Sequence, residues 1–264
     1  MSFGDILDGA FKLYRANLGT IVTVVLVFAL PVQLVASLAS RNVLGGHSII
    51  DVLNDPTVAD TSRGNGQLLL QGLAALAAWL VGPFVAGAIA KIVASSYLGH
   101  EITAGEAIRA SLRRFFPLLV AAIFVKLAEA VGLIGCGVGA VFVMPLWVVV
   151  APAIVVEELG PFAGMGRSYR LTTKRYWPVL GVALLAGLLT YLIGQTLSTV
   201  PSVVALLVGY KWGFPLVALA GILAELVRSP LTAIVATLIY FDLRIRTEAF
   251  DLQVMAAEMS RAQG

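Results

Sequence analysis

Residues 18–39 read LGTIVTVVLVFALPVQLVASLA, and no charged side chain interrupts them. A helix that crosses a hydrocarbon core of about 30 Å needs roughly 20 apolar residues, and this run supplies them between Arg15 and Arg41. A signal peptide is an alternative interpretation, since Lys12 and Arg15 precede the run. The run is longer than the roughly 7 to 15 apolar residues of a signal peptide, so we interpret it as a first membrane span.

The whole chain has the composition of a membrane protein rather than of a water-soluble one. Of its 264 residues, 59% are hydrophobic and 12% are charged, whereas soluble domains are about a quarter charged. Disorder is excluded as well, because apolar residues are plentiful and the charged residues form no tracts. We therefore predict an all-α, polytopic membrane protein that forms a single integral membrane domain over residues 1–264.

Long apolar segments recur along the chain and predict six transmembrane helices. The predicted spans are 18–39, 68–98, 117–134, 138–156, 178–207 and 215–241. The short connection Gly135-Cys136-Gly137 between the third and fourth spans predicts a tight helical hairpin. Residues 41–66, rich in Asn, Asp, Gly and Ser, form the one sizeable outer loop, which we interpret as a solvated connector rather than a binding module.

Lysine and arginine lie mostly on one side of these spans. The segments before spans one, three and five and after span six hold Lys12, Arg15, Arg109, Arg113, Arg114, Arg167, Arg170, Lys174, Arg175, Arg244, Arg246 and Arg261, with Lys91 at the same end of its helix. The opposite segments hold Arg41, Arg63 and Lys211. Because cytoplasmic loops carry the excess of basic residues, we predict that both termini are cytoplasmic.

The segments that precede spans one, three and five share an amphipathic pattern of helical spacing. Their apolar stripes are Phe3, Ile6, Leu7, Ala10, Phe11 and Tyr14, then Ile108, Leu112 and Phe115, then Met165, Tyr169, Thr172 and Tyr176. Residues 242–264 predict a further cytoplasmic helix of this kind. We predict a repeated unit of interfacial helix and hairpin, whose short helices either brace the spans or form a lipid or partner site where they meet.

Four ionisable residues fall inside predicted spans, where an unpaired charge is costly. Lys126 and Glu129 lie in span three, and Glu225 and Arg228 lie in span six, each pair at positions i and i+3 of one helix face. At about 1.5 Å per residue, both pairs lie roughly 18 to 20 Å from the inner ends of their spans and could meet. They form either a structural polar cluster that sets helix register or a proton or substrate pathway in which Glu129 or Glu225 titrates.

A dense group of charged residues lies on the inner side, just before the predicted fifth span and just after the predicted sixth span. We identify it as a candidate contact for lipid headgroups or a partner, and orientation by positive charge alone is the alternative. Its members are Glu157, Glu158, Arg167, Arg170, Lys174, Arg175, Trp177, Asp242, Arg244 and Arg246.

The sequence offers no set of residues for catalysis or metal binding. One cysteine, Cys136, forms no internal disulfide, and two histidines, His47 and His100, supply no zinc site. Glycines between residues 132 and 139 follow no strand, so they indicate close helix packing rather than a phosphate loop. We predict no catalytic residue, no metal, no cofactor and no nucleic-acid partner.

Several blocks of the chain carry a resemblance to a known family. They are GDILDGAF at 4–11, VEELGP at 156–161 with RSYRLT at 167–172, and YFDLRIRTEAFDL at 240–252, with Ala249 where we expect a glycine. The chain resembles the bacterial membrane domain attached to some glycerophosphoryl diester phosphodiesterases, which is related in layout to YciC-like inner-membrane proteins. The resemblance implies a multi-pass protein of the bacterial cytoplasmic membrane.

The resemblance does not imply phosphodiesterase activity. In the enzymes of this family, the chemistry belongs to a separate soluble barrel with paired histidines, acidic residues and a divalent metal, and this chain has no such region. Our leading hypothesis is a non-enzymatic component that organises lipid or partner proteins, including a second copy of itself, at the inner leaflet. The alternative is a small transporter or lipid carrier that uses the charges within the spans.

Overall fold

The computed structural model describes residues 3–58, 65–134 and 138–248. All regular structure in these residues is helical, in agreement with the predicted all-α class. The helices are α1 (Phe3–Ala16), α2 (Leu18–Ser40), α3 (Ile49–Asn54), α4 (Asn65–Tyr97), α5 (Ala104–Arg113), α6 (Phe115–Ile134), α7 (Val138–Trp147), α8 (Val150–Val156), α9 (Pro161–Thr173), α10 (Tyr176–Val208) and α11 (Tyr210–Glu248), with short 3-10 helices at Val43–Gly46 and Pro56–Val58.

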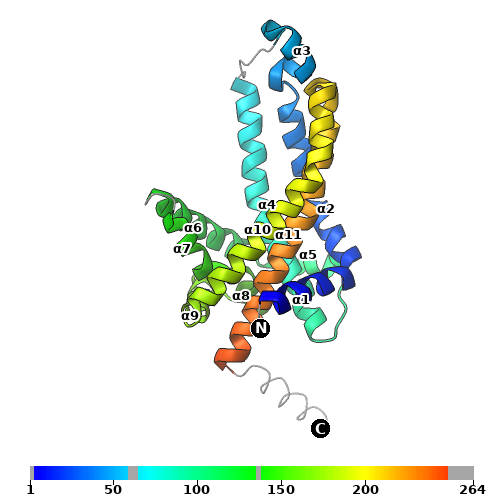
Figure 1. Ribbon diagram of the computed structural model, residues 1–264. Helices are drawn as coiled ribbons and strands as arrows, with labels where there is room; N and C mark the ends of the chain where they lie inside the picture. Colours follow the sequence, from blue (N-terminus) through cyan, green and yellow to red (C-terminus); the bar gives the residue numbers. More distant parts are fainter. Residues whose placement is uncertain (1–2, 59–64, 135–137, 249–264) are drawn as a thin grey trace.

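A bundle of four long helices, α2, α4, α10 and α11, runs the length of the molecule (Figure 1). The short helices α1, α5, α8 and α9 gather at one end, here called the basal end, and α3 lies at the opposite, distal end (Figure 1). Helix α11 is central, because it packs on α10, α2, α4 and α1 and because nearly all of its residues from Pro230 to Phe241 are buried.

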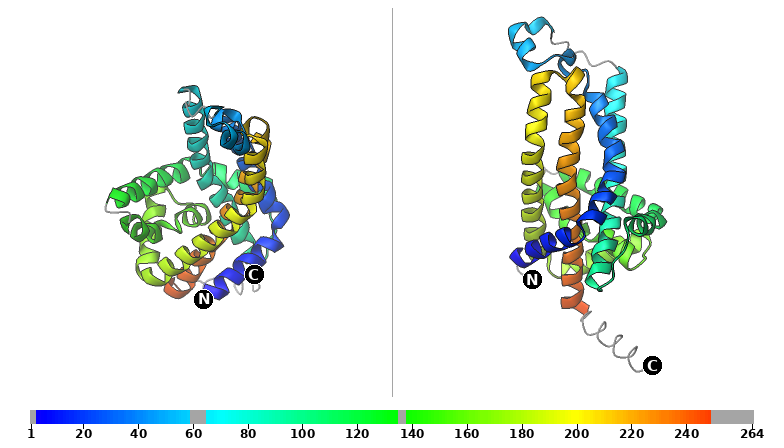
Figure 2. Two further views of the ribbon diagram at one scale, coloured as in Figure 1. Left: turned by 45° about the horizontal axis from the view of Figure 1, so that its top comes forward. Right: turned by 90° about the vertical axis from the view of Figure 1, so that its right-hand side faces the viewer.

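Within the described residues, five helices are long and apolar enough to cross a membrane: α2, α4, α6, α10 and α11. These helices indicate a multi-pass membrane protein. They correspond to five of the six predicted spans. The structure places α6 and α7 at a wide angle to the bundle, so this hairpin extends sideways from its basal half (Figures 1 and 2).

Residues 138–156 form two helices instead of the single predicted span. Helix α7 ends at Trp147, α8 begins at Val150, and residues 148 and 149 form a turn between them. Pro152 accounts for the break, because a proline lacks the N–H that a helix needs and its ring collides with the carbonyl four residues earlier, here that of Val148. The prediction of one continuous helix was wrong at this point.

The connection between α6 and α7 lies partly outside the described residues, which end at Ile134 and resume at Val138. Beyond it, the two helices approach very closely. A Cβ atom on Gly139 would lie 2.6 Å from the carbonyl oxygen of Gly132, so only glycine permits this contact. The structure thus confirms the interpretation of Gly132 and Gly139 as close-packing residues, whereas Gly135 and Gly137 lie outside the described residues.

Two further boundaries differ from the sequence prediction. The predicted outer loop 41–66 contains α3, which begins with a capping box in which Ser48 and Asp51 exchange hydrogen bonds, and residues 59–64 are not described. The predicted C-terminal helix does not start separately at residue 242, because α11 continues unbroken to Glu248. Residues 249–264 lie outside the described part.

Of the predicted repeat of interfacial helix and hairpin, the structure shows the order of a short helix followed by a long one, three times. A single residue, Asn17, separates α1 from α2, Arg114 separates α5 from α6, and two residues separate α9 from α10. The buried face of α1 contains Ile6 and Ala10, as predicted, and packs on α11.

The buried faces of α5 and α9 match the predicted apolar stripes only in part, since Ile108 and Met165 pack against the core and Thr172 is buried as predicted. Helix α5 buries Ala107 and Ser111, while Leu112 is nearly half exposed. Helix α9 buries Gly164, Ser168, Leu171 and Thr172, while Tyr169 is half exposed. Small and hydroxyl-bearing residues occupy the contacts because the neighbouring helices come too close for large side chains.

Hydroxyl groups of the short helices α1 and α9 satisfy backbone carbonyls that a proline or a helix break leaves unpaired. The Tyr14 hydroxyl on α1 donates to the carbonyl of Leu226 at 2.9 Å, and that carbonyl lacks its helical donor because Pro230 has no N–H. The Ser168 hydroxyl on α9 donates at 2.8 Å to the carbonyl of Leu146, next to the α7–α8 break. These bonds fix α1 on α11 and α9 on α7.

The close approach of α9 to α8 predicts a large effect of one added methyl group. A Cβ on Gly164 would collide with the side chain of Ile154, which is fully buried. We expect Gly164→Ala to lower the free energy of unfolding by about 1 to 3 kcal/mol, as overpacked cores do, in chemical unfolding of the detergent-solubilised protein. The control is Gly166→Ala on the same helix, where a Cβ meets nothing within 4 Å. Equal stability of the two variants would contradict the packing argument.

Candidate functional site at the basal end

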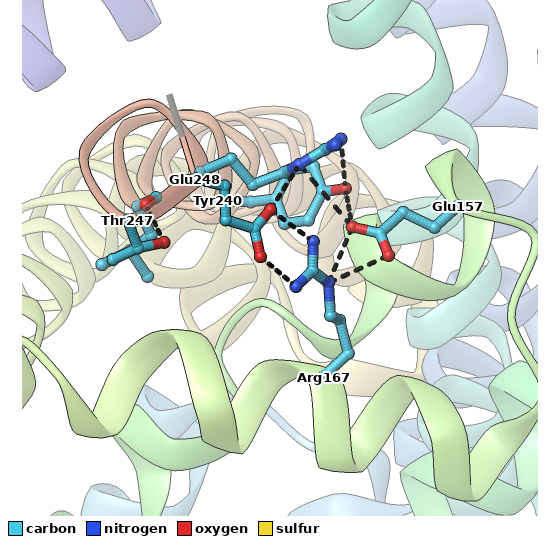
Figure 3. Close-up of polar contacts among 7 residues, drawn as sticks. Glu157, Arg167, Tyr240, Thr247 and Glu248 are labelled. Atoms are coloured by element: carbon cyan, nitrogen blue, oxygen red, sulfur yellow. Dashed lines mark hydrogen bonds and ion pairs between the residues drawn. The ribbon is translucent and has the colours of Figure 1, made fainter. Parts of the chain in front are cut away.

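A group of charged side chains joins α8, α9 and α11 at the basal end (Figure 3). Arg167 on α9 is at its centre. Its Nε donates to both carboxylate oxygens of Glu157 at 2.9 Å, and its Nη2 donates to Oε2 of Glu248 at 2.7 Å. Its Nη1 also donates to Glu248, so the guanidinium lies between two carboxylates from different helices.

Two residues of α11 complete what we call the basal ion-pair network: Glu157, Arg167, Tyr240, Arg244 and Glu248. The Tyr240 hydroxyl donates to Oε1 of Glu157 at 2.6 Å. Nη1 of Arg244 donates to the Tyr240 oxygen at 3.1 Å, and its Nε lies 3.4 Å from Oε2 of Glu248. The network thus joins the end of α8, the middle of α9 and the last two turns of α11.

The network is nearly buried and balanced in charge. The side chains of Arg167 and Arg244 are each 15% exposed, and they face the two glutamates. The hydrogen bond that Arg167 donates to Glu248, together with those that it donates to Glu157, raises the pKa of Arg167 further above its ordinary value despite the burial. Arg167 is therefore a permanent cation held inside the protein, with its donors directed at carboxylates rather than at solvent.

Three of the predicted headgroup or partner residues, Glu157, Arg167 and Arg244, thus contact one another in this structure. The network also includes Tyr240 and Glu248, which were not predicted as site residues. The available signal for Glu248 is its spacing of four residues from Arg244, which places both on one face of α11. For Tyr240, the signal is its position at the end of a predicted span. A tyrosine that is buried there usually needs a hydrogen-bond partner for its hydroxyl.

The remaining predicted contact residues divide into paired and exposed sets. Glu158 pairs with Arg114 at 2.5 Å, and Arg246 pairs with Asp242 at 3.0 Å. Exposed side chains at the end of α9 and the start of α10 are Arg170, Lys174, Arg175 and Trp177. We call the exposed cations of the short helices the basal basic surface; they are Lys12, Arg15, Arg109, Arg113, Arg170, Lys174 and Arg175.

The charges predicted within the spans do not come together. Lys126 and Glu129 form an ion pair of 2.6 Å on α6, while the Arg228 guanidinium lies over the ring of Tyr191 on α10 at 5.1 Å. No ion pair joins the two sets among the described residues, because α6 leaves the bundle sideways and α11 is not one of its main neighbours (Figure 1). Glu225 instead lines a cavity of about 100 Å³ between α2, α4 and α11.

The described residues contain no group of three His, Cys, Asp or Glu side chains that could hold a metal ion. Comparisons with protein-family models, with curated proteins and with solved structures find no match to this chain. The resemblance to the phosphodiesterase-associated membrane domain therefore stays a prediction.

Removal of the central cation of the network should destabilise the protein strongly. Arg167→Gln leaves Glu157 and Glu248 without their shared partner, and breaking a buried ion pair from one side costs about 3 to 5 kcal/mol. Chemical unfolding of the solubilised protein measures this loss. Arg170→Gln, one turn away on the exposed face of α9, is the matched control and should change stability by less than about 0.5 kcal/mol. If both variants unfold alike, the network does not hold the three helices together.

Proposed function

We propose that this protein is a non-enzymatic, multi-pass protein of the bacterial cell membrane whose basal end faces the cytoplasm. There the basal basic surface binds anionic lipid headgroups and so organises lipids, or partner proteins held with them, at the inner leaflet. The observation that carries the proposal is that α1, α5 and α9 lie at one end of the bundle (Figure 2) and that exposed cations lie on or next to these helices. It is consistent with the resemblance to the phosphodiesterase-associated membrane domain, a family to which we propose that the chain belongs.

The distribution of charge supports the orientation. Within the described residues, the distal end carries the basic residues Arg41 and Lys211, each placed over an aromatic ring. Arg63 and Arg261 lie outside the described residues. An excess of basic residues at the basal end is typical of the cytoplasmic side of a membrane protein.

The faces of the short helices support contact with lipid. The helices α5 and α9 turn small residues toward the bundle, which leaves large apolar side chains exposed beside the cations. Phe116 is 75% exposed and Trp177 is 69% exposed, both at points where a short helix leads into a long one. Exposed aromatic residues next to lysine and arginine are characteristic of helices that lie in the membrane interface.

A shallow groove on α5 combines both kinds of contact. Its volume is about 450 Å³, and it is lined by Gly105, Ile108, Arg109, Leu112 and Arg113. Two guanidinium groups beside two apolar side chains match an anionic headgroup and the start of its acyl chain. This groove is the strongest candidate for direct headgroup contact on the basal surface.

Charge reversal tests the proposal. We expect Arg109→Glu/Arg113→Glu to reduce copurifying anionic phospholipid, measured by native mass spectrometry, by roughly tenfold or more, since each basic residue near an anionic surface is worth about 1 kcal/mol. The matched control is the distal pair Arg41→Glu/Lys211→Glu, which should retain the lipid. Equal lipid content in the two double variants would overturn the proposal.

One observation favours the transporter alternative, namely the cavity that Glu225 and Gln33 line in the middle of the bundle. If lipid binding at the basal surface is the function, Glu225→Gln should leave copurifying lipid unchanged. Uptake of a solute into proteoliposomes that is lost in Glu225→Gln and retained in Glu129→Gln would instead establish the alternative. Both variants remove one charge from a long helix, so they are matched.

A further inference from the structure

A second groove lies between the bundle and the sideways hairpin, and we call it the lateral groove. Its volume is about 380 Å³, within the range of ligand pockets. Three elements form its walls: α4, α6 and the α7–α8 turn. The lining residues include Trp79 and Gly82 from α4, Ala122 and Lys126 from α6, and Trp147 beside the turn.

The chemistry of the lateral groove is that of an amphiphile site. All of its lining side chains are apolar except that of Lys126, so the walls favour a hydrocarbon and the single polar group favours an anion. Lys126 is 54% exposed whereas its partner Glu129 is 26% exposed. An ammonium group has three N–H donors, and the bond to Glu129 occupies one of them.

The surroundings of the groove point to lipid rather than to water or a soluble ligand. The outer side of α6 exposes Ile123, Phe124 and Leu127, so the groove continues an apolar surface. The hairpin lies in the basal half of the bundle (Figures 1 and 2). A lysine stem in this position can extend along apolar surface to the headgroup level of the inner leaflet.

We infer that the lateral groove holds one acyl chain of an anionic phospholipid whose phosphate accepts a hydrogen bond from Lys126. This site is separate from the basal basic surface, because it takes the chain of the lipid rather than only its headgroup. The inference requires that the protein lies in a membrane, as proposed above. It does not require that α5 binds headgroups. On this inference, the sideways position of α6 keeps the lateral groove open for the acyl chain.

Tryptophan fluorescence reports directly on the groove. The chain has four tryptophans, and a Trp177→Phe/Trp212→Phe background leaves Trp79 and Trp147, both of which line the groove. Phosphatidylglycerol with bromine atoms on one acyl chain, titrated into the protein in detergent micelles, should quench this fluorescence saturably. Quenching that rises linearly without saturation would mean general contact with the micelle and would overturn the inference.

Filling the groove should abolish most of the quenching. Gly82→Leu adds a side chain where a Cβ meets nothing within 4 Å, and we expect it to weaken lipid binding about tenfold, equivalent to about 1.4 kcal/mol. Gly72→Leu on the same helix, also without a neighbour within 4 Å, is the matched control and should bind as the background does. Ala122→Phe fills the groove from α6, so it tests the same point if Gly82→Leu does not fold. Equal binding by filled and control variants would overturn the site.

The headgroup contact is tested by a second pair of variants. Lys126→Gln should weaken binding of the brominated phosphatidylglycerol about fivefold, as expected for one charge-assisted hydrogen bond. The loss should be smaller for brominated phosphatidylcholine, because the choline cation already offsets the charge of its phosphate. Lys211→Gln removes an exposed lysine at the distal end, outside both proposed lipid sites, and should have no effect. If Lys126→Gln and Lys211→Gln bind alike, the phosphate contact is wrong.

Two results separate this inference from its alternatives. The Arg109→Glu/Arg113→Glu variant should lose the copurifying lipid held at the basal basic surface while it keeps saturable quenching in the groove, so failure of one proposal does not imply failure of the other. Size-exclusion chromatography with light scattering gives the oligomeric state. A dimer that Gly82→Leu converts to a monomer would show that a second copy, and not lipid, occupies the groove.

Discussion

The need to pair every backbone carbonyl away from water governs how this fold is assembled. In an apolar medium an unpaired carbonyl costs several kcal/mol, and prolines or breaks in long helices create such groups. Here the hydroxyls of Tyr14 and Ser168, from short helices, supply the missing donors to Leu226 and Leu146. At these two points, a carbonyl near a proline or a helix break is where a short helix attaches.

The apolar runs and the helical spacing of residues were sufficient to predict the four helices of the bundle, α6, and the short helices α1, α5 and α9. They were insufficient at residues 138–156. The apolar composition continues there without interruption, but the helix breaks before Pro152. The buried face of α9 was predicted only in part, with Met165 and Thr172 correct. Periodicity identifies large apolar residues, whereas this contact uses Gly164 and Ser168 because helix separation, which sequence does not reveal, excludes larger side chains.

The sequence predicted many of the charged residues of the candidate site. It did not predict which of them are enclosed in ion pairs and which are exposed. The sequence places Arg167 and Arg170 in one cationic segment. On a helix, however, a step of three residues is a rotation of about 300°. The two guanidinium groups therefore lie in different surroundings. Arg167 is enclosed by two carboxylates, and Arg170 is exposed. The pairing of Arg167 with Glu248 joins residues far apart in the chain, so only the packing of α9 on α11 reveals it. The structure thus separates Arg167, a cation that joins helices, from Arg170, a cation of the surface.

The bond between Tyr14 and Leu226 connects the first helix with the last, and this affects the order of biogenesis. Because α1 is synthesised before α11, its buried residues Ile6 and Ala10 have no final partner until translation has reached the end of the bundle. Until then α1 can rest in the interface as an amphipathic helix. Closure of the bundle is thus a late step, and a chain that stops before α11 leaves the first helix without its binding surface.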